Sequence, residues 1–317
     1  MITLTDNDFF TGLANLAIYM RLYSTTNGSM AQSFVDKFAT ETLDNGDTKI
    51  FPYADLPSVS NYSETSSLLT VTKVTTGEET ISITEKKVIK SSYSRQILEM
   101  AFTSDSGMNI FVGYLMGQMD SAKTKYLYED IVNSFANISN TYLAGSSQDI
   151  TIQITNPNSA ATAQEKEFIN LNNQKKVALA IQNYIQNIQV FSSNYNSKGL
   201  SEALDLSDLR LLVNGSWDNE QIINLFATLL KSEYIQNSFA KPEKLVVPSD
   251  YSIGGTANTP VVAFIMHKRF FQYFYKFTFM GSFFDVSNLV VNNFLHFWYG
   301  KGFLGYLPCV RISLQFN

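Results

Sequence analysis

Cysteine and histidine are nearly absent from the sequence, which narrows the chemistry that the chain can perform. Among 317 residues there are one cysteine and two histidines. The single Cys309 cannot form an intrachain disulfide, so we expect a chain that folds in a reducing cytoplasm. His267 and His296 lie in apolar, aromatic stretches, and neither has a second ligand at the i+3 or i+4 spacing of metal sites. We therefore expect structural histidines, a buried inert thiol, no metal and no cofactor.

Clustered positive charge is also missing. The chain has 23 Lys and Arg against 28 Asp and Glu, for a net charge of -5, and its pI is near 5.2. No run of basic residues occurs. Since affinity for phosphate comes from clustered Lys and Arg that release counterions, this composition argues against a dedicated nucleic-acid binder.

Long uninterrupted apolar runs are lacking too. Residues 9–20 are apolar, but Asp6 and Asp8 precede them in place of the basic residues that open a signal peptide, so we expect an ordinary helix there. Residues 261–297 are interrupted by His267, Lys268, Arg269, Lys276 and Asp285. No window reaches the roughly 18 to 20 uncharged apolar residues of a membrane-spanning helix. We predict a soluble protein with no membrane partner.

Signatures of catalysis are scarce. The chain has neither a Gly-X-Ser-X-Gly elbow nor a Gly-Lys-Ser or Gly-Lys-Thr phosphate loop. Residues 300–305 match the G-x-G-x-x-G spacing of dinucleotide-binding proteins. Only residues 306–317 follow, however, and they leave no room for the helix and second strand that this motif requires. We interpret these glycines as a bend between terminal strands and expect no enzyme.

A polar region with strand-like alternation is the first positive feature. Side-chain character alternates with period two between residues 68 and 90, on both sides of a predicted turn at Thr76-Gly77-Glu78-Glu79. Pro52 and Pro57 mark residues 50–65, before this hairpin, as extended loop. Both faces of the hairpin are fairly polar, and an isolated two-stranded ribbon is only marginally stable in water. The hairpin therefore needs a surface from elsewhere.

The pattern then changes to the helical period. Phe111, Leu115, Met119 and Tyr126 lie on one apolar stripe of a predicted helix over residues 108–137. At 1.5 Å per residue such a helix is about 45 Å long, well above the mean helix of about 11 to 12 residues. The sequence thus predicts a long, strut-like helix directly after a hairpin.

The remaining sequence is a mixture of helices and strands. Helices are predicted over 30–42, 165–191 and 217–234, and strands over 148–155, 208–214, 245–247 and the region after Val261. Residues 264–306 are much richer in aromatics than the 14% of the whole chain. Either a crowded sheet core or a surface used in subunit contacts accounts for that density.

This order of elements resembles the HK97-type fold of the major capsid proteins of tailed double-stranded DNA bacteriophages. The hairpin 68–90 is similar to the extended loop of that family, and residues 91–101 followed by the helix 108–137 are similar to its connector and spine helix. The strand 208–214 and the helix from Trp217 resemble its axial domain. The resemblance implies an α+β, HK97-like capsid fold with an N-terminal arm, extended β-hairpin loop, long spine helix, and peripheral and axial domains.

The resemblance also implies boundaries and an interface. The expected parts are an N-terminal arm (1–48), the extended loop (49–92), a peripheral domain (93–157) with its spine helix (108–137), an axial domain (158–285), and C-terminal strands that return to the peripheral domain (286–317). Because the extended loop of the family reaches over a neighbouring subunit, we expect subunit contacts from Leu69, Val71, Lys73, Glu78, Glu79, Ile81, Ile83 and Lys86.

The function that the resemblance implies is structural. Copies of the chain would form hexamers and pentamers of an icosahedral shell, with portal and possibly scaffolding or decoration proteins as partners. The shell would enclose DNA without sequence-specific binding, as a virion capsid assembled in the host cytoplasm. Two alternatives are an encapsulin-like nanocompartment shell protein and an enzyme with a site in the aromatic C-terminal region.

Overall fold

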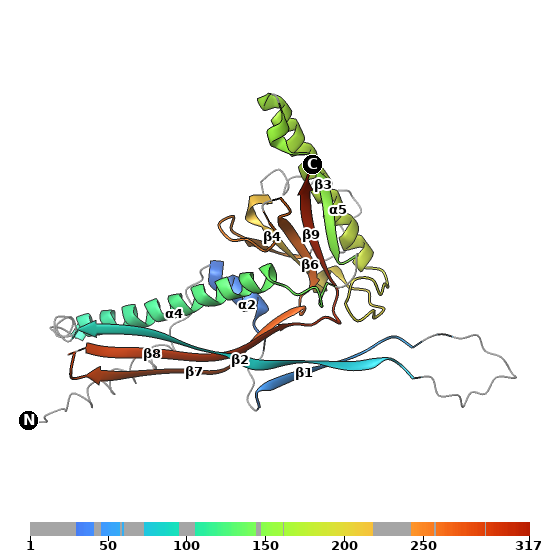
Figure 1. Ribbon diagram of the computed structural model, residues 1–317. Helices are drawn as coiled ribbons and strands as arrows, with labels where there is room; N and C mark the ends of the chain where they lie inside the picture. Colours follow the sequence, from blue (N-terminus) through green and yellow to red (C-terminus); the bar gives the residue numbers. More distant parts are fainter. Residues whose placement is uncertain are drawn as a thin grey trace, which may run out of the picture. The chain divides into compact units, whose positions relative to one another are not determined.

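The computed structural model contains both helices and strands, as Figure 1 shows. It describes residues 30–40, 46–57, 59, 73–94, 105–143, 147–160, 162–217, 242–256, 258–288 and 290–317, with the backbone alone for 105–116, Ser94 and Phe284. In chain order the elements are α2 (Met30–Phe38), β1 (Thr48–Ala54), β2 (Thr76–Ser94), α4 (Asp105–Ala136), β3 (Asp149–Ile154), η1 (Pro157–Ser159), α5 (Ala163–Ile188), η2 (Leu206–Asp208), β4 (Leu209–Asn214), η3 (Gly215–Trp217), β5 (Glu243–Val247), β6 (Val261–His267), β7 (Phe271–Asp285), β8 (Val290–Phe303) and β9 (Cys309–Phe316). The predicted α+β class is confirmed.

The chain divides into two compact units. The first comprises residues 1–49, 81–131 and 273–302, and the second comprises 50–80, 132–272 and 303–317. The five-part division expected from the capsid resemblance stays a prediction. The helices predicted over 9–20 and over 217–234 fall, except for Trp217, outside the described residues. No helix in the described ranges is long and apolar enough to cross a membrane.

The four-stranded sheet has the order β1-β2-β8-β7; most of it belongs to the first unit, and residues 50–54 of β1 and 76–80 of β2 belong to the second. Strands β2 and β8 are antiparallel, with Lys86 opposite Trp298 and Lys90 opposite Phe294. Burial alternates along β8, because every second side chain, from Val291 to Tyr299, points to a covered face. Helix α4 covers that face, and Tyr126 contacts Phe297 edge-on with ring centroids 5.9 Å apart (Figure 1).

Helix α4 confirms the predicted long helix almost residue for residue, since it runs from Asp105 to Ala136. Its apolar stripe is buried at Met119, Leu127, Ile131 and Phe135. Helix α2 packs on it in the first unit. The Phe34 ring lies 4.9 Å from that of Tyr128, and the Thr124 hydroxyl donates to Gln32 Oε1 (2.7 Å).

The sheet of the second unit has the order β3-β9-β6-β4-β5 and mixes parallel with antiparallel pairs. Strands β3 and β9 are parallel, as are β4 and β5, whereas β6 is antiparallel to both β4 and β9. Its core joins side chains such as Leu211, Ile265 and Ile312 to Val177 and Ile181 of α5. The capping box of Thr162 and Glu165 fixes the start of α5.

The predicted turn at Thr76–Glu79 is wrong, because these four residues are the first part of strand β2. Gly77 serves a close approach and not a turn, since a Cβ at this position would clash with the Tyr53 ring. The partner strand β1 lies within the predicted loop 50–65 and contains Pro52. Strand β1 is at the edge of the sheet, where a residue without an N–H is tolerated.

The predicted glycine bend between the terminal strands is wrong as well. Gly300 and Gly302 lie inside strand β8, which runs on to Phe303. A Cβ on Gly300 would come 2.7 Å from the Ser82 carbonyl oxygen, and one on Gly302 would come 3.0 Å from Ile81. These glycines therefore let β2 and β8 approach closely, and the match to a dinucleotide motif has this packing explanation.

Candidate assembly surface

Strands β1 and β2 form a hairpin whose outer strand buries almost nothing. The two strands are antiparallel, because the Asp55 N–H donates to the Thr75 carbonyl (2.8 Å) while the Ile83 N–H donates to the Asp47 carbonyl (2.7 Å). None of the seven residues of β1 is buried. The connection between the two strands, residues 55–75, is much longer than a tight hairpin turn. The hairpin thus offers exposed strand surface to a partner.

Within the second unit, contacts with residues 198–202 and 305–306 hold both strands of the hairpin in place. The Gly305 N–H donates to Glu79 Oε2 (2.7 Å), and Lys198 Nζ lies 3.2 Å from Glu79 Oε1. The Ser201 N–H donates to Asp55 Oδ1 (3.0 Å). The ring of Tyr53 stacks on that of Tyr306 with centroids 5.3 Å apart. With Glu202, described next, these residues are called the hairpin anchor.

Glu202 gives the hairpin anchor its unusual electrostatics. Its Oε2 is buried and has no hydrogen-bond partner among the described residues. Burial, and next the charge of Asp55, raise the pKa of Glu202 to about 7. Burial and then the neighbouring Glu202 and Glu79 raise the pKa of Tyr306. The anchor therefore holds more negative charge than its one lysine can balance, and proton uptake by Glu202 relieves it.

The residues predicted to form subunit contacts have three different environments. Lys73, Glu78 and Lys86 are exposed, and Ile83 is half-buried. Ile81 is buried, and Glu79 belongs to the hairpin anchor. Leu69 and Val71 lie outside the described residues. The exposed members remain available for a neighbouring subunit, whereas Ile81 and Glu79 already have partners in their own chain.

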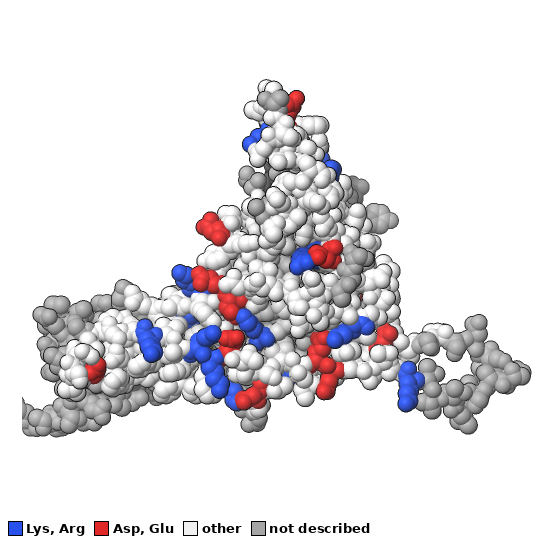
Figure 2. Space-filling view, viewed as in Figure 1, with Lys and Arg blue, Asp and Glu red and all other residues white. Residues whose placement is uncertain are grey.

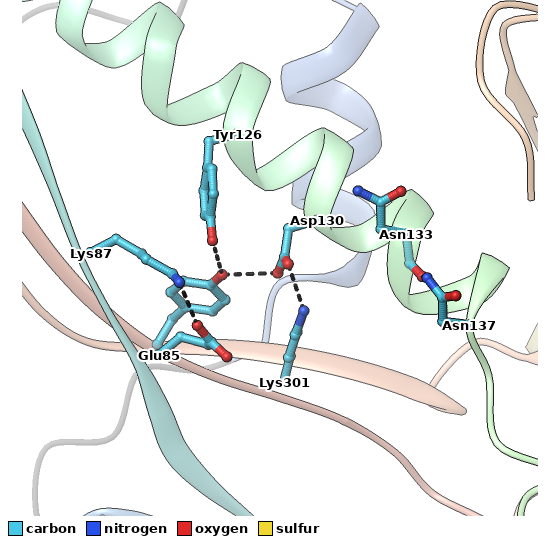
Figure 3. Close-up of polar contacts among 8 residues, drawn as sticks. Glu85, Lys87, Tyr126, Asp130, Asn133, Asn137 and Lys301 are labelled. Carbon is cyan, nitrogen blue, oxygen red and sulfur yellow. Dashed lines mark hydrogen bonds and ion pairs between the residues drawn. The ribbon is translucent and has the colours of Figure 1, made fainter.

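A polar cluster lies between α4 and β8 in the first unit (Figure 3). The Tyr299 hydroxyl donates to Asp130 Oδ2 (2.9 Å), and Lys301 Nζ lies 2.6 Å from Asp130 Oδ1. Burial, followed by its hydrogen bond with Tyr126, raises the pKa of Tyr299. These contacts give hydrogen-bond or ion-pair partners to polar side chains that lie between the helix and the sheet. We therefore assign the cluster a structural role. Sequence reasoning did not identify it, although Tyr126 and Asp130 are four residues apart on one helix face.

Of the residues considered for chemistry, Cys309 is buried and His267 is half-buried. His267 Nδ1 accepts the Arg269 N–H (2.9 Å), and burial lowers the pKa of His267 to about 4. Cys309 is buried, and its burial raises the pKa of the thiol. No group of three or more His, Cys, Asp or Glu within the described ranges could hold a metal ion. Both side chains have environments typical of structural residues.

Charges of both signs are mixed on the face of the molecule that Figure 2 draws. On the face drawn in Figure 2, Lys and Arg side chains lie close to Asp and Glu and do not gather into a separate basic field. Such a surface lacks the basic stripe that proteins use to hold nucleic-acid phosphates. The exposed hairpin, in contrast, has a surface that its own chain leaves uncovered.

Comparison with known proteins supplies an independent finding. The family model of the Phi29-like phage major capsid protein matches residues 21–313. No curated protein matches the sequence.

Several solved phage capsids have a similar fold. The capsid structure of Staphylococcus phage Andhra aligns with a TM-score of 0.55 and 11% identity, covering 87% of this chain and 83% of that chain. The capsid structure of cyanophage P-SCSP1u aligns with a TM-score of 0.53 and 15% identity, covering 90% and 88%. The mature capsid of bacteriophage PhiM1 aligns with a TM-score of 0.51 and 10% identity, covering 92% and 90%. At these identities the likeness concerns the fold alone.

Proposed function

The chain belongs to the Phi29-like phage major capsid protein family, and from this premise we propose that its copies assemble as hexamers and pentamers into an icosahedral shell around double-stranded DNA. That it is a structural subunit of a phage capsid shell follows from the family, whose model spans residues 21–313. The same match favours the viral shell over a nanocompartment. It also gives the chain a structural role, and we propose that it has no catalytic activity.

The exposed hairpin supports assembly through contacts between copies. Strand β1 buries none of its residues, and a two-stranded ribbon with so little covered surface is stabilised when a neighbour covers it. The hairpin anchor holds the base of this hairpin in the second unit, which leaves the connecting residues to reach a neighbouring subunit. In this proposal the contact residues are Leu69, Val71, Lys73, Glu78 and Lys86.

The remaining partners follow from a shell of this kind. We propose a portal and possibly scaffolding or decoration proteins as partners, and assembly in the cytoplasm of a bacterial host. The net charge of -5 and the mixed surface of Figure 2 suit a container that holds DNA without gripping it.

Removal of the hairpin tip tests the contact between copies. In the shortened variant Asn-Gly replaces residues 56–74, a two-residue turn that closes the strands where Asp55 and Thr75 pair. We expect the full chain to form capsomers or shells in light scattering and negative-stain microscopy, and the variant to keep its unfolding transition but remain monomeric. A variant that assembles as well as the full chain contradicts the role of the hairpin. A full chain that is monomeric at every concentration contradicts the shell.

The contents of the particles separate a virus from a nanocompartment. Particles isolated from infected cells should contain DNA that resists added nuclease until the shell is opened. Particles that hold a protein cargo and no nucleic acid would contradict the proposed DNA container.

A further inference from the structure

The sheet of the first unit has a second face, opposite α4, that carries a group of aromatic side chains. The aromatic face consists of Phe277, Phe279 and Phe283 on β7 and Phe294 and Trp298 on β8. It is opposite α4 because Phe297 and Tyr299, which alternate with Trp298 along β8, contact α4. The exposed fractions of Phe277, Phe279 and Phe283 are 42%, 52% and 55%.

The rings of this face touch within two groups, one of Phe277, Phe279 and Trp298 and the other of Phe283 and Phe294. Ring centroids are 5.4 Å apart for Phe277 and Trp298, 6.1 Å for Phe277 and Phe279, and 6.4 Å for Phe283 and Phe294. Single exposed hydrophobic residues are normal on a protein surface, but exposed aromatic residues grouped on one face mark an interaction site. We therefore expect an apolar partner to cover this face.

Two lysines define the charge that the partner should carry. Lys86 Nζ lies 4.6 Å from the centroid of Trp298, and Lys90 Nζ lies 5.9 Å from that of Phe294. Both side chains are exposed, and neither forms an ion pair with a described residue. An occupant with apolar side chains and a few carboxylates would complement both the rings and the lysines.

We propose that the chain's own residues 5–20 lie on the aromatic face as an amphipathic helix. Phe9, Leu13, Leu16 and Met20 recur at the spacing of one helix face, and Asp6 and Asp8 precede them. As a helix these 16 residues would be about 24 Å long, against the about 20 Å that β7 spans from Phe277 to Phe283. The apolar side would cover the rings, and the two carboxylates would approach Lys86 and Lys90.

The connection to this segment is long enough. The described chain begins at Met30 of α2, in the same unit. The Thr40 N–H donates to the Tyr273 carbonyl (2.8 Å), which attaches the end of α2 to β7, the edge strand of the sheet. Residues 21–29 can extend about 30 Å, more than the about 10 Å between stacked layers that they must cross around this edge. The proposal concerns one chain and does not depend on the proposed shell.

Tryptophan fluorescence tests the proposal directly, because Trp217 and Trp298 are the only tryptophans. In a Trp217→Phe background Trp298 is the single reporter. Dilute subunits, shown by light scattering to be monomeric, are compared with and without residues 2–20. We expect the deletion to shift Trp298 emission to the red and to raise its quenching by acrylamide toward that of a free indole. A peptide of residues 1–22 should reverse both changes, and a scrambled peptide should not.

Charge reversal then tests the pairing of carboxylates with lysines. Changing Asp6→Lys and Asp8→Lys in the peptide should weaken its binding to the deleted chain by about fivefold for each exposed pair that is lost. Lys86→Glu with Lys90→Glu in the protein should restore binding of the reversed peptide. Because Lys86 touches the indole, each protein variant is compared with its own peptide-free spectrum.

Other occupants would give different results. In one outcome the deletion leaves Trp298 emission unchanged in monomers, but Trp298 becomes protected from acrylamide when particles form. That result assigns the face to a second copy and overturns the proposal, while the capsid function stands. Quenching of Trp298 in the full chain by a single-stranded oligonucleotide overturns it in favour of base stacking. Equal binding of scrambled and native peptides also overturns it.

Discussion

The two sheets of this protein differ in how completely they are covered. In the second unit, strand β4 is buried at five of its six residues and β6 at six of its seven, so both faces of the sheet centre are packed. Strand β8 of the first unit is buried at every second residue, and β1, whose residues 50–54 belong to the second unit, is buried at none. Two aromatic-rich regions of one chain thus have opposite relations to solvent.

This difference indicates which surfaces the fold completes by itself. A strand buried on both faces reads as a continuous apolar run, whereas alternation leaves one face for another partner. The second unit contains a finished core, whereas the first unit and the hairpin present rings and strand edges. The aromatic residues of positions 264–306 therefore include both core residues, such as Phe264, and exposed ones, such as Phe279.

The largest expected effect comes from the core of the second unit. Phe135 has 0% exposure and contacts the rings of Phe264, Phe271 and Phe303 at centroid distances of 5.2 to 5.4 Å. Phe135→Ala should lower the free energy of unfolding by about 3 to 5 kcal/mol, because it removes these contacts and leaves a cavity. Urea denaturation of the subunit measures the change.

Phe168→Ala is the matched control, since Phe168 on α5 is 65% exposed. It should change the free energy of unfolding by no more than about 0.5 kcal/mol. Similar losses for the two substitutions would remove the distinction between a finished core and an open surface.

The next effect concerns the covered face of the first unit. Asp130→Ala removes the acceptor of the Tyr299 hydroxyl and the partner of Lys301. We expect a loss of about 1 to 3 kcal/mol in the free energy of unfolding, because the buried Tyr299 hydroxyl keeps only its long hydrogen bond with Tyr126 (3.4 Å).

The adjacent Glu129 offers a control for this substitution. It pairs with Lys125 at 3.9 Å on the exposed side of the same helix. Glu129→Ala should cost about 0 to 1 kcal/mol, as exposed ion pairs do. An Asp130 variant that is no less stable than the Glu129 variant would show that the polar cluster adds nothing to the covered face.

Elements with a local sequence pattern could be predicted. The apolar stripe of α4 placed the helix at 108–137, and the structure has it at 105–136. The strand expected at 208–214 is β4, and the helix expected at 165–191 is α5, which starts at Ala163 because Thr162 caps it. These predictions succeed because neighbouring residues in the chain determine them.

Features that depend on distant residues could not be predicted. Gly77 indicated a turn in its local sequence, but its requirement comes from the ring of Tyr53 on the partner strand. The hairpin anchor unites Asp55, Glu79, Glu202 and Gly305, which no sequence window contains. The likeness to capsids predicted a hairpin that contacts neighbours, but it gave no indication that Glu79 would be engaged within its own chain.

The smallest expected effect is a pH dependence of stability at the hairpin anchor. The anchor joins the exposed hairpin to the packed core within the second unit. The pKa of Glu202 is raised from 4.5 to about 7, so between these values the folded state binds more protons than the unfolded state. Stability contributed by protonated Glu202 is therefore present at low pH and is lost as pH rises toward 7. His267, whose pKa is lowered to about 4, acts in the opposite direction below 6.5, so only a difference between variants isolates Glu202.

Glu202→Gln keeps the shape of the side chain and cannot ionise. We expect the variant to gain stability relative to the native chain as pH rises from 4.5 to 8, with the difference levelling off above about 7. The protection of the amides of residues 76–80 against hydrogen exchange, corrected for the intrinsic rate at each pH and measured on monomeric subunits, should fall from pH 5 to pH 8 in the native chain and stay unchanged in the variant. If both proteins lose protection equally between the two pH values, the protonation of Glu202 does not control how firmly the hairpin anchor holds the hairpin. A neighbouring subunit would then be needed to hold the hairpin in place.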